Sequence, residues 1–181
     1  MKQNAVQGFT LIEIIITTSI IAILGVVITQ VLSTTTRTNT KVGIMSDVKQ
    51  NGDFALIMME RLIRSARQVT SSCSEAGDTL DSVILENTDG NTTTLTCAYD
   101  GSVTRVASVS AIGTSYLTGT NVTLGGSSCS GSTLLFTCKG IQGVTQAISI
   151  GFTLTQGNAS QFISEQSMTP FQSTVMVRNR K

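Results

Sequence analysis

The sequence predicts an α+β protein in which one long N-terminal helix packs on an antiparallel β-sheet head. Two observations favour this class. A helical pattern of apolar residues runs from Phe9 to about Arg67, and two-residue alternation replaces it beyond residue 70. A single helix followed by a run of antiparallel strands is typical of α+β architecture.

The composition argues against several classes of function. The chain has 181 residues, a net charge of +1 and only 13% charged residues, so its overall charge gives no support for nucleic-acid binding. It contains no histidine, which is the commonest general base and metal ligand in proteins. We therefore expect a protein that is not an enzyme and that needs no cofactor or metal ion.

The helix begins with an apolar segment, residues 9–32, that is long enough to cross a membrane. At about 1.5 Å per residue a helix of this length spans roughly 36 Å, against a bilayer core of roughly 30 Å. A secretory signal peptide has a shorter apolar core followed by its cleavage site. Here the polar stretch, residues 1–8, comes first and carries Lys2. Cleavage at its end would leave the apolar helix on the mature chain.

Glu13 is the single charged residue of this apolar segment. An unpaired carboxylate near the start of a membrane helix costs about 2–4 kcal/mol, depending on depth. One explanation is that the carboxylate reaches the membrane surface and is favoured by the helix dipole. The other is that cleavage after Gly8 creates a cationic amine on Phe9, which neutralises Glu13 in the same helix or in a neighbouring subunit.

The string Gly8-Phe9-Thr10-Leu11-Ile12-Glu13, after a short basic leader, resembles the processing motif of type IV prepilins and type II secretion pseudopilins. The resemblance implies that a membrane aspartyl peptidase cuts between Gly8 and Phe9 and N-methylates Phe9. It also implies that Glu13 pairs with the N-terminus of an adjacent subunit during filament assembly.

The resemblance further implies partners and a location. The partners are other pilins or pseudopilins, a prepilin peptidase, an inner-membrane platform protein with its assembly ATPase, and membrane lipid before assembly. The expected location is the bacterial inner membrane, crossed once with the head in the periplasm or outside, and then a pilus or pseudopilus filament. Many major pilins have a helix-bending proline in the membrane half. None lies between residues 9 and 32 here, which favours a minor subunit.

The second part of the helix, residues 33–68, is predicted to be amphipathic. A Thr-rich stretch comes first, and Gly25, Gly43 and Gly52 are expected soft points, since glycine disfavours helix by roughly 1 kcal/mol. The predicted apolar stripe has the spacing of one helix face about 100° wide, and we expect it to pack on a sheet rather than form a free helix or a coiled coil. Its members are Val42, Met45, Val48, Ala55, Leu56, Met59, Leu62, Ile63 and Ala66.

Residues 69–181 are predicted to form the β-rich head. Asp89-Gly90 and Asp100-Gly101 lie between alternating segments and predict two hairpin turns. The predicted strands are residues 80–86, 92–99, 103–109, 133–138, 144–155 and 171–178. Residues 99–105 and 171–180 are similar to the head and C-terminal strand of J-type minor pseudopilins and related minor pilins.

Four cysteines, Cys73, Cys97, Cys129 and Cys138, follow the apolar segment and predict disulfides made in an oxidising compartment. Three connectivities are open, and four buried free thiols are the alternative. We favour Cys129–Cys138, which closes a small loop, with Cys73–Cys97. The role of these cysteines is structural, because the chain has no histidine to activate a thiolate.

Other features have simpler explanations. Arg61, Arg64 and Arg67 resemble a DNA-binding patch, as do Arg178, Arg180 and Lys181 at the chain end, but a helix dipole and a solvated tail explain them better. Asp78, Asp81, Asp89 and Asp100 are better explained as turn residues than as calcium ligands. Glycosylation sequons at Asn91, Asn121 and Asn158 are expected by chance in a chain this rich in Asn and Thr.

The sequence thus predicts a structural subunit, a minor pilin or pseudopilin, that assembles through its N-terminal helix. Two alternatives from other classes remain open. One is a membrane-anchored adhesin or DNA-binding competence pilin at a filament tip, and the other is a membrane-tethered hydrolase. The sequence does not distinguish secretion, motility, adhesion and DNA uptake.

Overall fold

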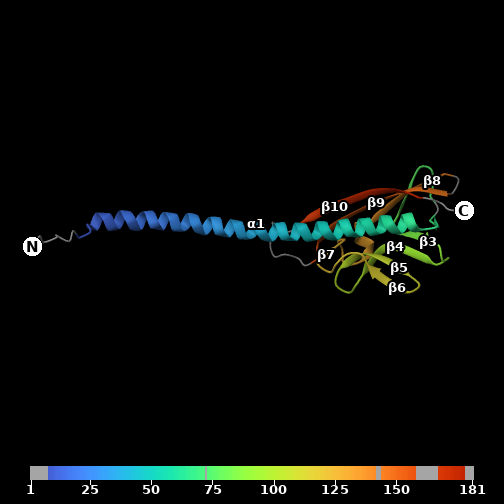
Figure 1. The fold of residues 1–181 in the computed structure, drawn as a ribbon, viewed down its shortest axis with the longest axis horizontal. Helices are drawn as coiled ribbons and strands as arrows, with labels where there is room; N and C mark the ends of the chain where they lie inside the picture. Colours follow the sequence, from blue (N-terminus) through green and yellow to red (C-terminus); the bar gives the residue numbers. More distant parts are fainter. Residues whose placement is uncertain (1–7, 72, 142–143, 158–166, 178–181) are drawn as a thin grey trace, which may run out of the picture. The chain divides into compact units, whose positions relative to one another are not determined.

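The fold was obtained as a computed structural model that describes residues 8–71, 73–141, 144–157 and 167–177. The chain divides into two compact units, Met1–Thr40 and Lys41–Lys181, and each is described by itself below. Helix α1, Leu11–Ser65, begins in the first unit and ends in the second (Figure 1). All other elements belong to the second unit, the head.

Helix α1 begins and ends within two residues of the predicted bounds, Phe9 and Arg67. Thr10 precedes its first residue, and the Thr10 carbonyl accepts hydrogen bonds from the backbone N–H groups of Glu13, at 3.1 Å, and Ile14, at 3.3 Å. At the other end Ala66 N–H still bonds the Leu62 carbonyl. Arg67 N–H bonds the Glu86 carbonyl instead, which turns the chain into the first strand.

The head contains two antiparallel sheets whose strands have the orders β1-β3-β4-β5-β6 and β10-β9-β8-β2, and β7 pairs with β9 beside β8 (Figure 1). This arrangement confirms the predicted α+β class. The strands are β1 Gln68–Val69, β2 Asp78–Leu80, β3 Val83–Glu86, β4 Thr92–Tyr99, β5 Thr104–Ser110, β6 Gly113–Tyr116, β7 Val122–Thr123, β8 Leu135–Ile141, β9 Val144–Gln156 and β10 Met168–Met176, with a short 3-10 helix, η1, at Cys129–Gly131.

Both predicted hairpin turns are correct. Strands β3 and β4 pair antiparallel around Asp89-Gly90, and β4 and β5 pair around Asp100-Gly101. Gly90 and Gly101 have φ angles of 81° and 98°, which L side chains rarely adopt. The Asp-Gly pairs therefore specify these turns through the glycine backbone.

The predicted strand at residues 80–86 is wrong as one element. Leu80 ends β2 and pairs with Phe136 in the second sheet, whereas Val83 begins β3 and pairs with Leu95 in the first. The chain crosses between the sheets at Asp81 and Ser82, and alternation of apolar residues continues across that crossing. Strands β1, β6 and β7 were not predicted, because they are short and β6 is exposed at every position. Arg178, at the end of the last predicted strand, lies outside the described residues.

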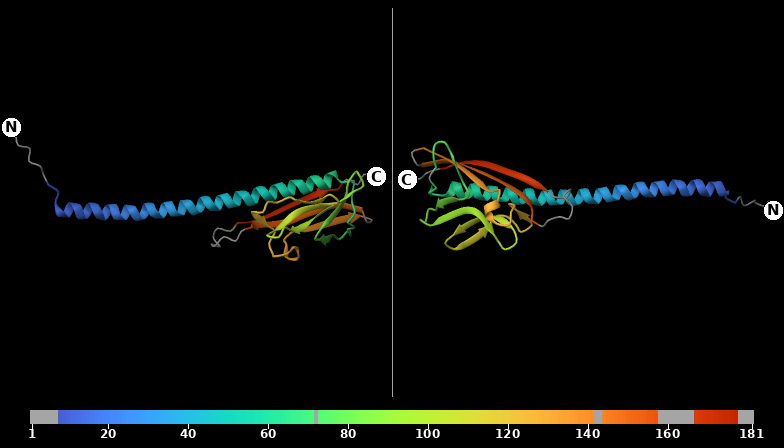
Figure 2. Two further views of the ribbon diagram at one scale, coloured as in Figure 1. Left: turned by 90° about the horizontal axis from the view of Figure 1, so that it is seen from below. Right: turned by 180° about the vertical axis from the view of Figure 1, so that it is seen from behind.

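The second half of α1 packs on the sheets through one face, as predicted. In the left view of Figure 2 the strands lie on one side of this part of the helix. Side chains of both sheets meet the helix in one apolar core. The buried helix residues are Val48, Gly52, Ala55, Met59 and Ile63, and Ala66 follows them just past the helix end. Val42 and Met45 are exposed, so the predicted stripe begins too early.

Gly52 is a close packing contact of the head. The Phe171 ring of β10 lies so near that a Cβ atom on residue 52 would be 2.1 Å from the ring carbon Cζ. Phe171 also stacks on Phe152 of β9, with ring centroids 5.2 Å apart. Packing therefore explains the glycine at this helix position. The sequence predicted only a soft point in the helix here and no packing contact.

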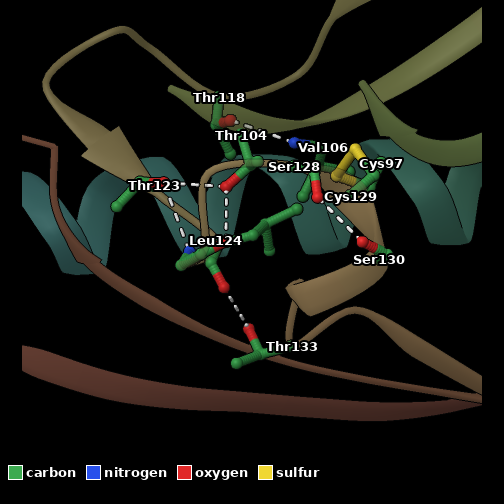
Figure 3. Close-up of a disulfide and its surroundings, with 11 residues drawn as sticks. Cys97, Thr104, Val106, Thr118, Thr123, Leu124, Ser128, Cys129, Ser130 and Thr133 are labelled. Carbon is green, nitrogen blue, oxygen red and sulfur yellow. Dashed lines mark hydrogen bonds between the residues drawn. A yellow bond between two sulfur atoms is a disulfide. The ribbon is translucent and has the colours of Figure 1, made fainter. Parts of the chain in front are cut away.

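The predicted disulfide pairing is wrong, although all four cysteines are paired. Cys73 bonds Cys138 and Cys97 bonds Cys129. Sheet pairing decides the partners: β2, shortly after Cys73, pairs with β8 so that Asp78 lies opposite Cys138. Figure 3 shows Cys129, on η1, reaching Cys97. Closeness in sequence favoured Cys129–Cys138, but the two residues belong to different parts of the head.

Hydrogen bonds of threonine side chains hold the segment that leads to η1 (Figure 3). The Thr104 hydroxyl, fully buried on β5, bonds the Thr123 hydroxyl at 2.8 Å and donates to the Gly125 carbonyl at 2.8 Å. Thr133 donates to the Leu124 carbonyl at 3.0 Å and accepts from Thr153 N–H of β9 at 3.0 Å. These bonds add to the backbone hydrogen bonds that continue past the end of β7, from Leu124 N–H to the Thr104 carbonyl at 2.9 Å and from Thr133 N–H to the Leu124 carbonyl at 3.1 Å.

We predict that Gly52→Ala destabilises the head by about 1–3 kcal/mol, because the new methyl group overlaps the Phe171 ring. Gly43→Ala is the matched control, since a Cβ there meets nothing within 4 Å and alanine favours helix. Urea unfolding of the full chain in detergent, followed through the head, measures both. Equal stabilities of the two variants would contradict the packing role of Gly52.

Candidate processing and assembly segment

Gly8 and Phe9, the residues of the predicted cleavage site, lie in an exposed, non-helical stretch just before α1. The Phe9 side chain is 79% exposed. A Cβ on Gly8 would meet nothing within 4 Å, and Gly8 is not among the glycines with positive φ. The described fold therefore gives no reason for a glycine at position 8, and the peptide bond after it is accessible to another protein.

Glu13 lies in the first turn of α1, where the helix dipole favours a negative charge. Thr10 is the N-cap: its hydroxyl oxygen accepts a hydrogen bond from Glu13 N–H at 3.4 Å. Within the described residues no hydrogen bond or ion pair joins the Glu13 carboxylate to another group. The carboxylate is exposed, so it is free to bind a partner.

Thr10 is a residue of this segment that the sequence prediction missed. The spacing Thr10-x-x-Glu13 is that of a capping box, in which Ser or Thr at the cap is followed three residues later by Glu or Gln. That pattern was present in the string and predicts the start of the helix within one residue. It also gives Thr10 a role in fixing where the helix, and with it Glu13, begins.

The hydroxyl residues of the apolar segment bond within the helix. Thr17 donates to the Glu13 carbonyl at 2.9 Å, Thr18 to the Ile14 carbonyl at 2.9 Å and Ser19 to the Ile15 carbonyl at 2.7 Å. Thr29 makes the same bond to the Gly25 carbonyl, at 2.8 Å. A hydroxyl without a partner costs several kcal/mol in an apolar medium. These bonds make the segment compatible with lipid despite its polar residues.

The first unit of the chain does not bury the apolar side chains of this segment. Residues 8–40, from Gly8 to the end of that unit, are all exposed. Helix α1 is long and apolar enough to cross a membrane. An exposed apolar surface of this extent needs lipid or other proteins around it in water.

Three of the four aspartates considered as calcium ligands, Asp78, Asp89 and Asp100, accept hydrogen bonds from protein groups, and Asp81 is exposed. Asp100 Oδ1 accepts hydrogen bonds from Ser102 N–H and Val103 N–H, and its Oδ2 forms an ion pair with Arg105 at 3.0 Å. Asp78 accepts from Ser74 N–H and Asp89 from Asn91. Within the described ranges no group of three or more possible metal ligands occurs. Their environments are those of turn residues.

Hydrogen bonds hold the pKa of two of these carboxyls below the ordinary value of 3.8. For Asp100 the main cause is the Val103 backbone N–H, followed by the hydroxyl and backbone N–H of Ser102. For Asp89 the pKa is lowered mainly by the Asn91 side-chain amide, then by the Asn91 backbone N–H. Both carboxyls are stabilised as anions by their own turns.

The arginines near the end of α1 do not form one free basic patch. Arg64 forms an ion pair with Glu60 at 3.8 Å, and Arg67 with Glu86 at 3.5 Å. Arg61 is exposed. The other basic group of the sequence, Arg178, Arg180 and Lys181, lies outside the described residues.

Residues 3–29 match the family model of the prokaryotic N-terminal methylation motif. The chain therefore carries the N-terminal signature of type IV prepilins and pseudopilins. Neither a search of curated proteins nor one of solved structures finds a match.

The motif supports a type IV pilin or pseudopilin that prepilin peptidase processes. It implies assembly with other pilins, and together with the long apolar helix it fits membrane anchoring and a filament. Proteins of this type are generally structural and not enzymes.

We predict that the Asp100 turn contributes to the acid sensitivity of the head. A carboxyl with a lowered pKa stabilises the fold above its unfolded-state value, and this contribution is lost as the pH falls toward the folded-state pKa. Asp100→Asn should lower the urea midpoint at pH 7 and reduce its decline between about pH 5 and pH 2. Asp81→Asn, an exposed control, should change neither. If the urea midpoint of Asp100→Asn fell with pH as steeply as that of the wild-type protein, the prediction would be contradicted.

Proposed function

We propose that the chain is a structural subunit, a minor pilin or pseudopilin, of a type IV pilus-like or type II secretion filament. It is cut after Gly8, N-methylated on Phe9 and drawn into the filament through α1. The observation that carries this proposal is an exposed apolar helix whose first turn holds Glu13, a carboxylate with no partner among the described residues, inside the matched methylation motif.

Electrostatics gives the assembly step its driving force. Cleavage would place a cationic amine on Phe9, four residues before Glu13 in the chain. In lipid the unpaired Glu13 carboxylate costs about 2–4 kcal/mol, and a buried cation close to it offsets that cost. When the amine and the carboxylate belong to neighbouring subunits, the same ion pair ties the N-terminus of one copy to the first helical turn of the next.

The two halves of α1 then have different tasks. Residues 9–32 hold the subunit in the membrane and pack with other helices in the filament, residues 33–68 carry the head, and residues 69–181 form the filament surface. Residues 1–8 are the leader. The open space around Gly8 supports recognition by a peptidase as the reason for a glycine there.

The proposed partners are sister pilins, a prepilin peptidase, and a platform protein with its ATPase. The subunit waits in the bacterial inner membrane with its head in the periplasm or outside. The chain's only proline is in β10 at position 170, so the apolar segment has no proline bend. This straightness supports a minor subunit rather than a major one.

We predict that the mature chain begins at Phe9 and carries one extra methyl group on its amine. Mass spectrometry of the N-terminal peptide from a host with the peptidase measures both. Gly8→Val should retain the leader, because a branched side chain blocks the peptidase while the space around residue 8 leaves the fold unchanged. Native disulfides in the variant would show that its head is folded. A wild-type chain that starts at Met1 in such a host would sink the proposal.

We predict that Glu13→Ala and Glu13→Gln both leave the subunit in the membrane but reduce its incorporation into filaments at least tenfold. The glutamine variant keeps the shape and removes only the charge, so it isolates the ion pair with the Phe9 amine. Immunoblots of sheared filaments and membranes measure the distribution, with Asp81→Asn as the control. Normal incorporation of both variants would contradict the role proposed for the Glu13 carboxylate in assembly.

A further inference from the structure

The two disulfides of the head are nested along the chain. In order of sequence, the first cysteine, Cys73, bonds the fourth, Cys138, and the second, Cys97, bonds the third, Cys129. The outer pair has a sequence separation of 65 and encloses the whole of the inner loop, which has a separation of 32. The first cysteine therefore has to stay unpaired, or change its partner, until the last one is in place.

The strands that come first in the head bring Cys73 toward a non-native partner. Strand β1 pairs with one edge of β3, and β4 pairs with the other edge. Extended in the same registers, β1 places Cys73 and β4 places Cys97 level with Asp81, just before β3 begins. The two cysteines are then two strand spacings apart, or roughly 10 Å. Strand β8, which carries the native partner of Cys73, is made later.

Loop length favours the same non-native pair. The chain between Cys73 and Cys97 is shorter than the loop of the native bond, and shorter loops close more readily. Once Cys73 and Cys97 are joined, Cys129 and Cys138 have only each other as partners. The few residues between these two close a small loop, so both bonds of the head are then wrong.

A head oxidised in this way has no thiol with which to correct itself. The chain has four cysteines, and none of them is free when two bonds have formed. Disulfides rearrange by attack of a thiolate on a disulfide sulfur. Because all four sulfurs are in bonds, that thiolate has to come from another molecule.

We propose that the head acquires its native disulfides through a thiol–disulfide isomerase, a protein whose cysteine thiolate exchanges with the disulfides of the chain. The inference rests on the proposed function, which places the head in an oxidising compartment outside the inner membrane and exports it from the helix end onward. A separate disulfide oxidase makes the first bonds by taking two electrons and two protons from each pair of thiols. The isomerase then changes the partners without net oxidation.

Three exchanges convert the wrong pairs into the native ones. The isomerase thiolate attacks the Cys97 sulfur of Cys73–Cys97, forms a mixed disulfide and releases the Cys73 thiolate. The Cys73 thiolate attacks the Cys138 sulfur of Cys129–Cys138, which makes the native outer bond and releases the Cys129 thiolate. The Cys129 thiolate attacks the Cys97 sulfur of the mixed disulfide, which makes the native inner bond and returns the isomerase thiolate.

Burial makes these exchanges run in one direction. Cys73 is 5% exposed and Cys138 is 0% exposed, so the bond between them is closed to further thiolates once β2 pairs with β8. Cys97 and Cys129 are half-buried, and Cys129 lies on η1 (Figure 3). The more accessible bond is therefore the one at which the isomerase leaves last.

The test is to produce the full chain in a host that keeps its disulfide oxidase and lacks its isomerase. Free thiols are alkylated, and disulfide-linked peptides are identified by mass spectrometry. The native pairs should fall several-fold, and Cys73–Cys97 and Cys129–Cys138 should take their place. Isomerase supplied from a plasmid should restore the native pairs, and an isomerase without its active-site cysteine should not. Wild-type levels of native pairing without the isomerase would overturn the proposal.

Variants with one native pair are the matched controls. C97S/C129S keeps only Cys73 and Cys138, which have no wrong partner within the chain, so their bond should form equally with and without the isomerase. C73S/C138S gives the same control for the inner pair. This readout holds whether or not the variant head folds, because two cysteines can form only one bond within a chain. If either variant depended on the isomerase as strongly as the wild type, partner exchange would be excluded as its role.

A mixed disulfide provides a second measurement. An isomerase that lacks its resolving cysteine should be captured on the wild-type chain through Cys97, and peptide mapping identifies the linked residue. No captured complex, or a complex through another cysteine, would contradict the exchanges assigned above.

The N-terminus of the chain, read in the same samples, separates this inference from the proposed function. A chain that begins at Phe9 and has native pairs in the host without isomerase would refute the isomerase and leave the proposed function intact. Four free thiols in a host with the oxidase would show that the head does not reach the oxidising compartment, and both proposals would then fail.

Discussion

The structure depends on one constraint: the first part of α1 presents an apolar surface that its own unit does not cover. Lipid or other helices must cover these side chains, because exposing an apolar surface of this extent to water is unfavourable. The backbone hydrogen bonds of the helix and the bonds of Thr17, Thr18 and Ser19 to helix carbonyls make either environment acceptable. What neither environment accepts without a partner is the Glu13 carboxylate.

The second half of the same helix has a different role, because it packs against both sheets in one core. Residues spaced at helical intervals from Val48 to Ile63 provide the apolar contact, and Gly52 lets the Phe171 ring approach the helix backbone. Asn51 adds a polar tie, because its side-chain oxygen accepts a hydrogen bond from Gly119 N–H at 2.7 Å. The helix therefore fixes both β10 and the loop between β6 and β7.

Local signals were enough to predict the parts of the fold that depend on local structure. Helix α1, the Asp-Gly hairpins and strand β4 follow from periodicity and turn chemistry, and β4 has the bounds that were predicted. Contacts between distant parts were not predictable in this way. The partners of Cys73 and Cys129 depend on which strands pair, and the break at Asp81 depends on two sheets sharing one core. At the candidate site the string from Gly8 to Glu13 indicated its chemistry, while the capping role of Thr10 was overlooked.

The Cys73–Cys138 bond has a mechanical consequence. A filament subunit that is pulled along its helix transmits the load into the head where α1 ends, at Ser65. Cys73 follows shortly and is covalently tied to β8. If the contacts of the last helical turn broke, the segment from Ser65 to Cys73 could extend to no more than about 30 Å before the disulfide carried the load. The second sheet would then bear tension directly through its backbone, and strands β2 to β7 would still lie within the loop that this bond closes.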